Sequence, residues 1–126
     1  MHLLAENDEA LRLATSSETL LNATVESFAV RYESDGLVAE VRFRLQHSQY
    51  PNRLLLRFQP VTAYAFAYSQ EVAFYHVESF KFLRVANGYY LSLDPVDESD
   101  QANERDNDTI RAEGVQAYHL TESDSN

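Results

Sequence analysis

The segment from Phe80 to Pro95 restricts the fold of this chain more than any other stretch. It reads as two strands joined at Asn87-Gly88. Asn-Gly is a strong signal for a two-residue hairpin turn, because both central residues take a positive φ that these two residues tolerate. Residues 89–94 then alternate between an apolar face and a polar face. Pro95 removes a ladder donor and ends the strand. The segment therefore predicts an antiparallel hairpin.

Alternation with a period of two continues over most of the chain. Residues 24–34 and 37–46 predict a second hairpin, which turns at Asp35-Gly36. Further strands are expected at 53–58, 61–68, 72–85, 109–112 and 115–120. These strands predict a mainly β fold, with an antiparallel sheet forming a sandwich or a partial barrel.

The N-terminal segment is less regular. Asp8 to Ala14 predicts a short helix, with Asp8 as the cap and good helix formers after it. An α+β fold is the alternative, with the N-terminal segment and residues 70–77 helical across one sheet face.

The length of 126 residues predicts one domain, which buries roughly two-thirds of its unfolded surface. Within it, residues 1–23 form an N-terminal segment that the pattern does not fully assign. Residues 24–120 form the β core, and residues 121–126 are expected to be a frayed polar tail.

The composition excludes several classes of protein. The chain has no cysteine, which excludes a disulfide scaffold, a thiolate metal site and a Cys nucleophile. Its first residues lack the basic flank and apolar run of a signal peptide, and no window approaches the ~20 apolar residues of a membrane span. We therefore expect a cytoplasmic protein that makes no contact with membranes.

The formal net charge of −10 is unevenly distributed along the sequence. Residues 1–25 carry −3, residues 26–93 carry +1 and residues 94–126 carry −8. Such a balance argues against binding to nucleic acid, which needs a basic surface. It favours either simple solubility or a basic protein partner.

Seven carboxylates lie between Asp94 and Asp108, in what we call the acidic segment (residues 94–108). A calcium loop of the EF-hand type needs Gly at its sixth position and Glu at its twelfth. Counted from Asp100, those positions hold Arg105 and Arg111, so no metal site is predicted. A solvated loop is one interpretation and partner recognition is the other. The candidate partner-binding carboxylates are Asp97, Glu98, Asp100, Glu104, Asp106 and Asp108.

Eight tyrosines and no tryptophan are present. Tyrosine combines an apolar body with a polar tip and is common at interfaces. Alternation places several tyrosines in the core, which leaves Tyr50 and Tyr90 as the interface candidates.

Five arginines are predicted to project from a single face of the sheet, if strands 24–34, 37–46 and 53–58 are neighbours. Such a face could contact an anionic partner, the acidic segment or a second copy of the chain. The alternative is cross-strand pairing with Glu33 and Glu40 on a wet surface. The five residues are Arg31, Arg42, Arg44, Arg53 and Arg57.

The sequence shows no catalytic motif and calls for no cofactor. The four histidines are scattered and none has the spacing of HExxH. No serine has a Gly-x-Ser-x-Gly context, and three glycines provide no phosphate-binding loop. A small-molecule-binding barrel, or a hydrolase that uses acidic-segment carboxylates, is therefore the least favoured class.

Residues 80–83, 87–95 and 104–108 together look like small uncharacterised bacterial proteins, some of which are thought to be immunity proteins of toxin systems. The resemblance covers about residues 25–118. It implies a stoichiometric inhibitor whose acidic surface meets a basic toxin domain. Our interpretation is a non-enzymatic protein-binding domain. The alternative is a self-associating structural domain, such as a homodimer.

Overall fold

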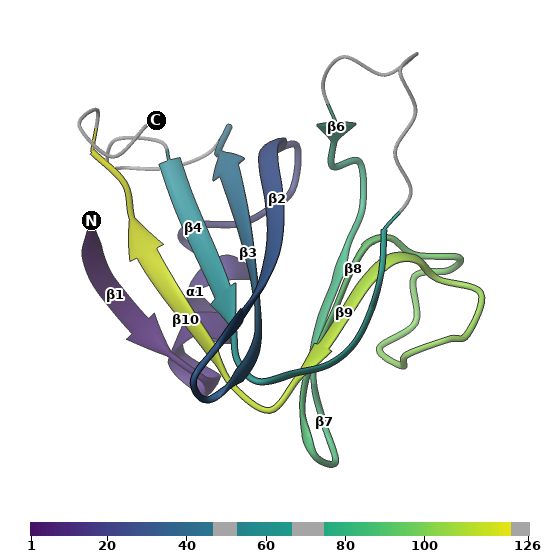
Figure 1. Ribbon diagram of the computed structural model, residues 1–126. Helices are drawn as coiled ribbons and strands as arrows, with labels where there is room; N and C mark the ends of the chain where they lie inside the picture. The colour runs from purple at the N-terminus through teal and green to yellow at the C-terminus, as the bar shows by residue number, and fades with distance from the viewer. Residues whose placement is uncertain (47–52, 67–74, 122–126) are drawn as a thin grey trace.

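The computed structural model describes residues 1–46, 53–66 and 75–121. Its strands form two antiparallel sheets that pack against each other (Figure 1). The order is β1-β10-β4-β3-β2-β6 in the six-stranded sheet and β5-β9-β8-β7 in the four-stranded sheet. The strands are β1 His2–Glu6, β2 Thr24–Glu33, β3 Gly36–Arg44, β4 Arg53–Phe58, β5 Val61–Ala65, β6 Tyr75–His76, β7 Lys81–Val85, β8 Gly88–Asp94, β9 Asn107–Ala112 and β10 Val115–His119.

A bent two-stranded ribbon joins the sheets. The chain passes from β4 to β5 at Gln59-Pro60 and from β9 to β10 at Glu113-Gly114. The pair β4–β10 of the six-stranded sheet therefore continues as the pair β5–β9 of the four-stranded sheet. The Gln59 amide donates to the Gly114 carbonyl at 3.0 Å, and the Glu113 amide donates to the Pro60 carbonyl at 3.0 Å. Figure 1 shows the sheets meeting at this bend.

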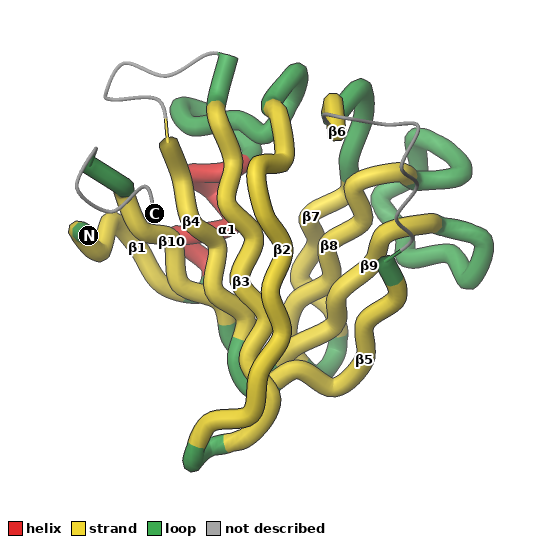
Figure 2. The backbone as a smooth tube through the Cα atoms, turned by 45° about the horizontal axis from the view of Figure 1, so that its top comes forward, coloured by secondary structure: helices red, strands yellow, loops and turns green. Residues whose placement is uncertain are grey.

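The short helix α1, Asp8–Ala14, packs on β1, β10 and β7 and covers one side of the sandwich (Figure 2). Its inward residues Ala10 and Ala14 are fully buried. The Asn7 amide donates to the Val115 carbonyl at 2.7 Å, and the Val115 amide donates to Asn7 Oδ1 at 3.0 Å. These reciprocal bonds fix the start of the helix on the ribbon.

The core lies between the two sheets. Phe43 and Phe58 face inward from the six-stranded sheet, and Leu91 and Ile110 face inward from the four-stranded sheet; all four are fully buried. The Phe58 ring lies 6.1 Å from the Phe82 ring across the interior. Burial of each such side chain stabilises the fold by about 1.5–3 kcal/mol.

The mainly β prediction is confirmed: two antiparallel sheets pack together and do not close into a barrel. The helix has the predicted bounds, but its cap position is Asn7, and no side chain caps it. Strand β1 was not predicted, because its short run of residues shows no clear alternation. Tyr75 and His76 form a strand and are not helical, whereas residues 70–74 lie outside the described residues. No described helix has the length and apolar character needed to cross a bilayer.

Both predicted turns are displaced by one residue. The two-residue loops are Ser34-Asp35 and Ala86-Asn87, and the following glycines begin the next strands. Gly36 has φ 121° and Gly88 has φ 148°, whereas Asn87 does not take the predicted positive φ. Close packing explains the position of Gly88, because a Cβ there would lie 2.1 Å from the Ala112 carbonyl oxygen.

Strand β8 is buried on both faces, contrary to the prediction of one wet side. Tyr89, Leu91 and Leu93 face the core as expected, but Tyr90 and Ser92 are buried as well. The acidic segment folds over this outer face, as the contacts described below show. Alternation reports which residues share a face, and it does not report whether a loop covers that face.

Candidate functional site

A buried polar cluster lies on the outer face of the four-stranded sheet, beneath the acidic segment. Lys81 on β7 and Tyr90 on β8 project from this face, and Asp106 approaches them just before β9 begins. The Lys81 side chain is 3% exposed and the Asp106 side chain 0% exposed. Burial of a charged pair is tolerated only where hydrogen bonds satisfy both groups.

Asp106 accepts hydrogen bonds from both ends of the acidic segment. The Val96 amide donates to Oδ1 at 2.8 Å, and the Asn103 amide donates to Oδ2 at 3.0 Å. The Tyr90 hydroxyl donates to Oδ2 at 2.7 Å, and Lys81 Nζ lies 3.1 and 3.2 Å from the two carboxylate oxygens. One carboxylate therefore ties the segment to the sheet at two separate points.

Lys81 binds the middle of the segment. Its Nζ donates to the Gln101 carbonyl at 2.8 Å and lies 2.8 Å from Asp97 Oδ1. Burial lowers the pKa of Lys81, but its hydrogen bonds to Asp97 and Asp106 outweigh that effect and raise the pKa above the ordinary value. An ammonium has three donors, and all of them are engaged here.

The cluster is not poised for proton transfer at neutral pH. Burial and the hydrogen bond to Asp106 raise the pKa of Tyr90. Burial also acts to raise the pKa of Asp106, but hydrogen bonds from Tyr90 and from the Val96 and Asn103 amides bring it below its ordinary value. General acid–base catalysis is most efficient with a pKa near the working pH, and these shifts move the pKa values of Tyr90 and Asp106 away from neutral pH.

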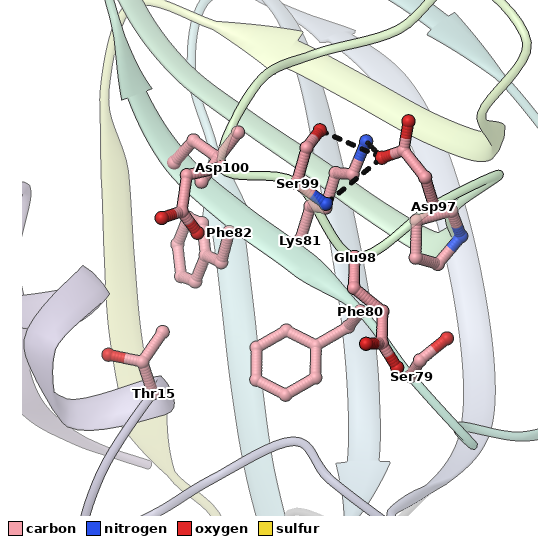
Figure 3. A pocket seen from close by; sticks show the side chains of 11 residues that line it. Thr15, Ser79, Phe80, Lys81, Phe82, Asp97, Glu98, Ser99 and Asp100 are labelled. Atoms are coloured by element: carbon pink, nitrogen blue, oxygen red, sulfur yellow. Dashed lines mark hydrogen bonds and ion pairs between the residues drawn. The ribbon is translucent and has the colours of Figure 1, made fainter.

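A pocket of about 240 Å³ lies between the end of α1 and the acidic segment (Figure 3). Figure 3 shows Lys81 and Ser99 converging on Asp97, with Glu98 between Phe80 and Ser79. Among the described residues, no group of three histidine or carboxylate side chains is placed to hold a metal ion. The lining residues include Thr15, Ser79, Phe80, Leu83, Glu98 and Asp100.

The predicted partner-binding carboxylates divide into two groups. Asp97, Glu98, Asp100 and Glu104 are exposed, and in the described parts of the chain the last three make no ion pair or side-chain hydrogen bond. As whole residues, Asp106 and Asp108 are only 8% and 7% exposed. The structure therefore buries both carboxylates, contrary to the expected exposed position, and their contact with a partner stays a prediction. Tyr90 is likewise buried, at 2% exposure, where its hydroxyl donates to Asp106. Tyr50 lies outside the described residues.

The five predicted arginines lie on one face of the six-stranded sheet, where four of them pair with acids of the same chain. Arg31 Nη1 lies 2.9 Å from Glu40, and Arg57 Nη1 lies 3.0 Å from the other Glu40 oxygen. Arg44 and Arg53 pair with Glu26, Arg31 and Arg57 also pair with Glu33, and Arg42 has a partner as well. Cross-strand pairing, the alternative interpretation, therefore describes this face.

The arginine pairs differ in burial, and this predicts different effects of mutation. Arg57 is 18% exposed and pairs with Glu33 and Glu40. Arg44 is 51% exposed, and its one ion-pair partner among the described residues is Glu26. We expect Arg57→Met to lower the free energy of unfolding by about 1 kcal/mol, because Glu40 is left half-compensated. Arg44→Met should cause no measurable loss in urea denaturation. Equal losses in the two variants would contradict this account of the face.

Acid is expected to release the acidic segment. Hydrogen bonds from Lys81 and then Ser99 lower the pKa of Asp97 from 3.8 to about 2. A carboxyl whose folded pKa is depressed stabilises the fold above its unfolded pKa, so this contribution is lost as the pH falls from about 4 towards 2. The Ser99 amide signal should follow that titration in heteronuclear NMR spectra, whereas amides of β3 should not. A Ser99 signal that shifts only above pH 4 would contradict the assigned pairing.

The sequence analysis did not identify the role of Lys81, nor a second polar contact, which joins Asp8 at the start of α1 to the four-stranded sheet. Arg84 Nη1 donates to Asp8 at 2.7 and 2.6 Å, and the Tyr89 hydroxyl donates to the same carboxylate. These hydrogen bonds, that from Tyr89 first, lower the pKa of Asp8. A lysine between Phe80 and Phe82 was the available signal for the first cluster, because an isolated cation in an apolar run needs a partner. No local sequence pattern predicts the contact of Asp8 with Arg84 and Tyr89.

Comparison with known proteins gives this chain no relative. No protein-family model matches it, no curated protein matches it, and no solved structure matches it.

Proposed function

We propose that this protein is a non-enzymatic binding domain that holds a basic protein partner with its acidic segment. One observation carries the proposal: Asp106 and Lys81 fix the segment on the sheet, while Glu98, Asp100 and Glu104 stay exposed and unpaired among the described residues. On the opposite sheet, by contrast, Glu26, Glu33 and Glu40 are all paired with arginines. Three carboxylates available to a partner thus lie within one fixed segment, whereas the other exposed carboxylates without a partner among the described residues, such as Glu6, Asp35 and Glu113, lie singly in the sequence.

A fixed acidic surface suits recognition for two physical reasons. A segment that is already ordered loses little conformational entropy when it binds, so more of the contact energy appears as affinity. Complementary charge also speeds association and selects among partners. The resemblance to immunity proteins supports the same proposal, with a basic toxin domain as the partner and the cytoplasm as the site of action.

The test is affinity capture with a matched pair of charge variants. In the first variant Glu98, Asp100 and Glu104 are replaced by lysine. In the control, the exposed residues Glu6, Asp35 and Glu113 are replaced by lysine, which changes the net charge equally. We expect the wild type and the control to retain one basic protein that elutes as salt rises, and the first variant to lose it.

Two outcomes would contradict the proposal. Equal retention by both variants would show that the acidic segment makes no specific contact. If the folded wild type retained no specific protein, the proposed partner would not exist.

A further inference from the structure

Strand β5 forms an outer edge of the four-stranded sheet (Figure 2). In the part of the chain that the structure describes, β5 pairs only with β9. Residues Thr62 to Ala65 are exposed, and Tyr64 is 48% exposed. One side of this strand therefore offers its backbone donors and acceptors to solvent or to another chain.

The sequence of β5 lacks the usual protection of an edge. Natural edge strands carry charges, especially lysine, or proline, because these residues discourage pairing with another chain. Strand β7, at the other edge of the same sheet, carries the exposed Arg84. From Val61 to Phe66 there is neither a charge nor a proline. A bulge at Thr62 interrupts only the start of the strand, where its hydroxyl donates to the Arg111 carbonyl at 3.2 Å.

We propose that β5 is a self-association edge, which pairs antiparallel with β5 of a second copy about a two-fold axis at Tyr64. The sequence Ala63-Tyr64-Ala65 reads the same in both directions. A two-fold axis at its centre therefore places Ala63 opposite Ala65 of the second copy, with small side chains on both sides. Such a self-complementary contact is what an isologous dimer requires.

The aromatic side chains beside β5 also favour pairing with β5 of a second copy. The Tyr64 ring lies 6.1 Å from the Phe28 ring, and Phe28 stacks on Phe66 at 4.0 Å. Phe28 and Phe66 are only half-buried. The pairing brings the two Tyr64 rings together across the axis, where cross-strand aromatic pairs stabilise antiparallel ladders.

Charge distinguishes this contact from the proposed binding of a basic partner. Strand β5 carries no charged residue, whereas the acidic segment carries seven carboxylates. Each copy still carries a net charge of −10, and two copies repel each other at low ionic strength. Salt should therefore strengthen self-association, whereas it should weaken binding to a basic protein.

The first test uses the absence of cysteine from the chain. Residues opposite each other in an antiparallel pair have Cα atoms about 4.5–5.5 Å apart, within the range of about 4.4–6.8 Å that a disulfide needs. Ala63→Cys and Ala65→Cys chains are mixed at high salt, one of them labelled with ¹⁵N, and oxidised. We expect the disulfide between the two different variants to predominate and the 14.4 kDa mass to double. A Tyr32→Cys chain, 85% exposed on β2, should stay monomeric.

A random distribution of disulfides among the variants, or equal cross-linking of Tyr32→Cys, would overturn the proposal. If no cross-link formed, β5 would not pair with a second copy of this chain. That result would also overturn the proposal and would favour pairing with a strand of a different protein. Sedimentation equilibrium of the unmodified chain provides the second measurement. The dimer fraction should rise with salt and should be lost in Ala65→Lys, and a wild type that stays monomeric at every concentration contradicts the proposal.

Discussion

Asp106→Asn is expected to lower the free energy of unfolding by about 3 kcal/mol. The change removes the charge that compensates buried Lys81, and an amide cannot accept all the hydrogen bonds that reach both carboxylate oxygens. Loss of one partner from a buried ion pair typically costs about 3–5 kcal/mol. The lower end applies here, because Lys81 keeps Asp97 and the Gln101 carbonyl.

The matched control is Asp100→Asn, which removes an exposed carboxylate from the same segment. It should change stability by no more than about 0.5 kcal/mol. Urea denaturation followed by circular dichroism measures both variants. Similar midpoints for Asp106→Asn and the wild type would show that the buried cluster does not stabilise the fold.

Gly88→Ala is expected to cost about 4 kcal/mol or to prevent folding. The new Cβ would lie 2.1 Å from the Ala112 carbonyl oxygen and 2.8 Å from Glu113 Cα, and both are backbone atoms of the neighbouring ribbon. Only displacement of β9 from β8 relieves such a contact. The φ of 148° adds strain for any residue with a side chain. Thermal denaturation and the yield of folded protein measure the effect.

Gly36→Ala provides the comparison, because Gly36 occupies the same place in the other hairpin. Its φ is 121°, and the nearest atom to a new Cβ is Pro60 Cβ at 3.1 Å. We expect a cost of about 1–3 kcal/mol from backbone strain, with the fold retained. If Gly88→Ala proved no more harmful than Gly36→Ala, the close approach of β8 to Ala112 would not be the reason for this glycine.

Local patterns predicted the strands and hairpins because the period of alternation is a property of neighbouring residues. The helix at Asp8–Ala14 was predicted from the helix propensity of its residues, which is also a local property. The turn at Asn87-Gly88 was placed one residue late, because packing of Gly88 on Ala112, rather than the turn signal, decides which residues form the loop.

The polar cluster could not be predicted locally. Lys81 and Asp106 are separated by 25 residues, and they meet only because the segment between β8 and β9 folds back over the sheet. The carboxylate density of that segment indicated a surface, and it could not show that Asp106 turns inward. The pairing of the arginine face was predicted as an alternative, because opposite charges on adjacent strands of one face are expected to pair.

The central claim is that Asp106 holds the acidic segment in a fixed position on the sheet. Hydrogen exchange at the Val96 and Asn103 amides tests it most directly, because both donate to the Asp106 carboxylate. We predict that both amides are protected in the wild type and lose protection in Asp106→Asn, while the amides of β3 keep theirs. Exchange at the rate of an open loop in the wild type, or unchanged protection in the variant, would contradict the claim.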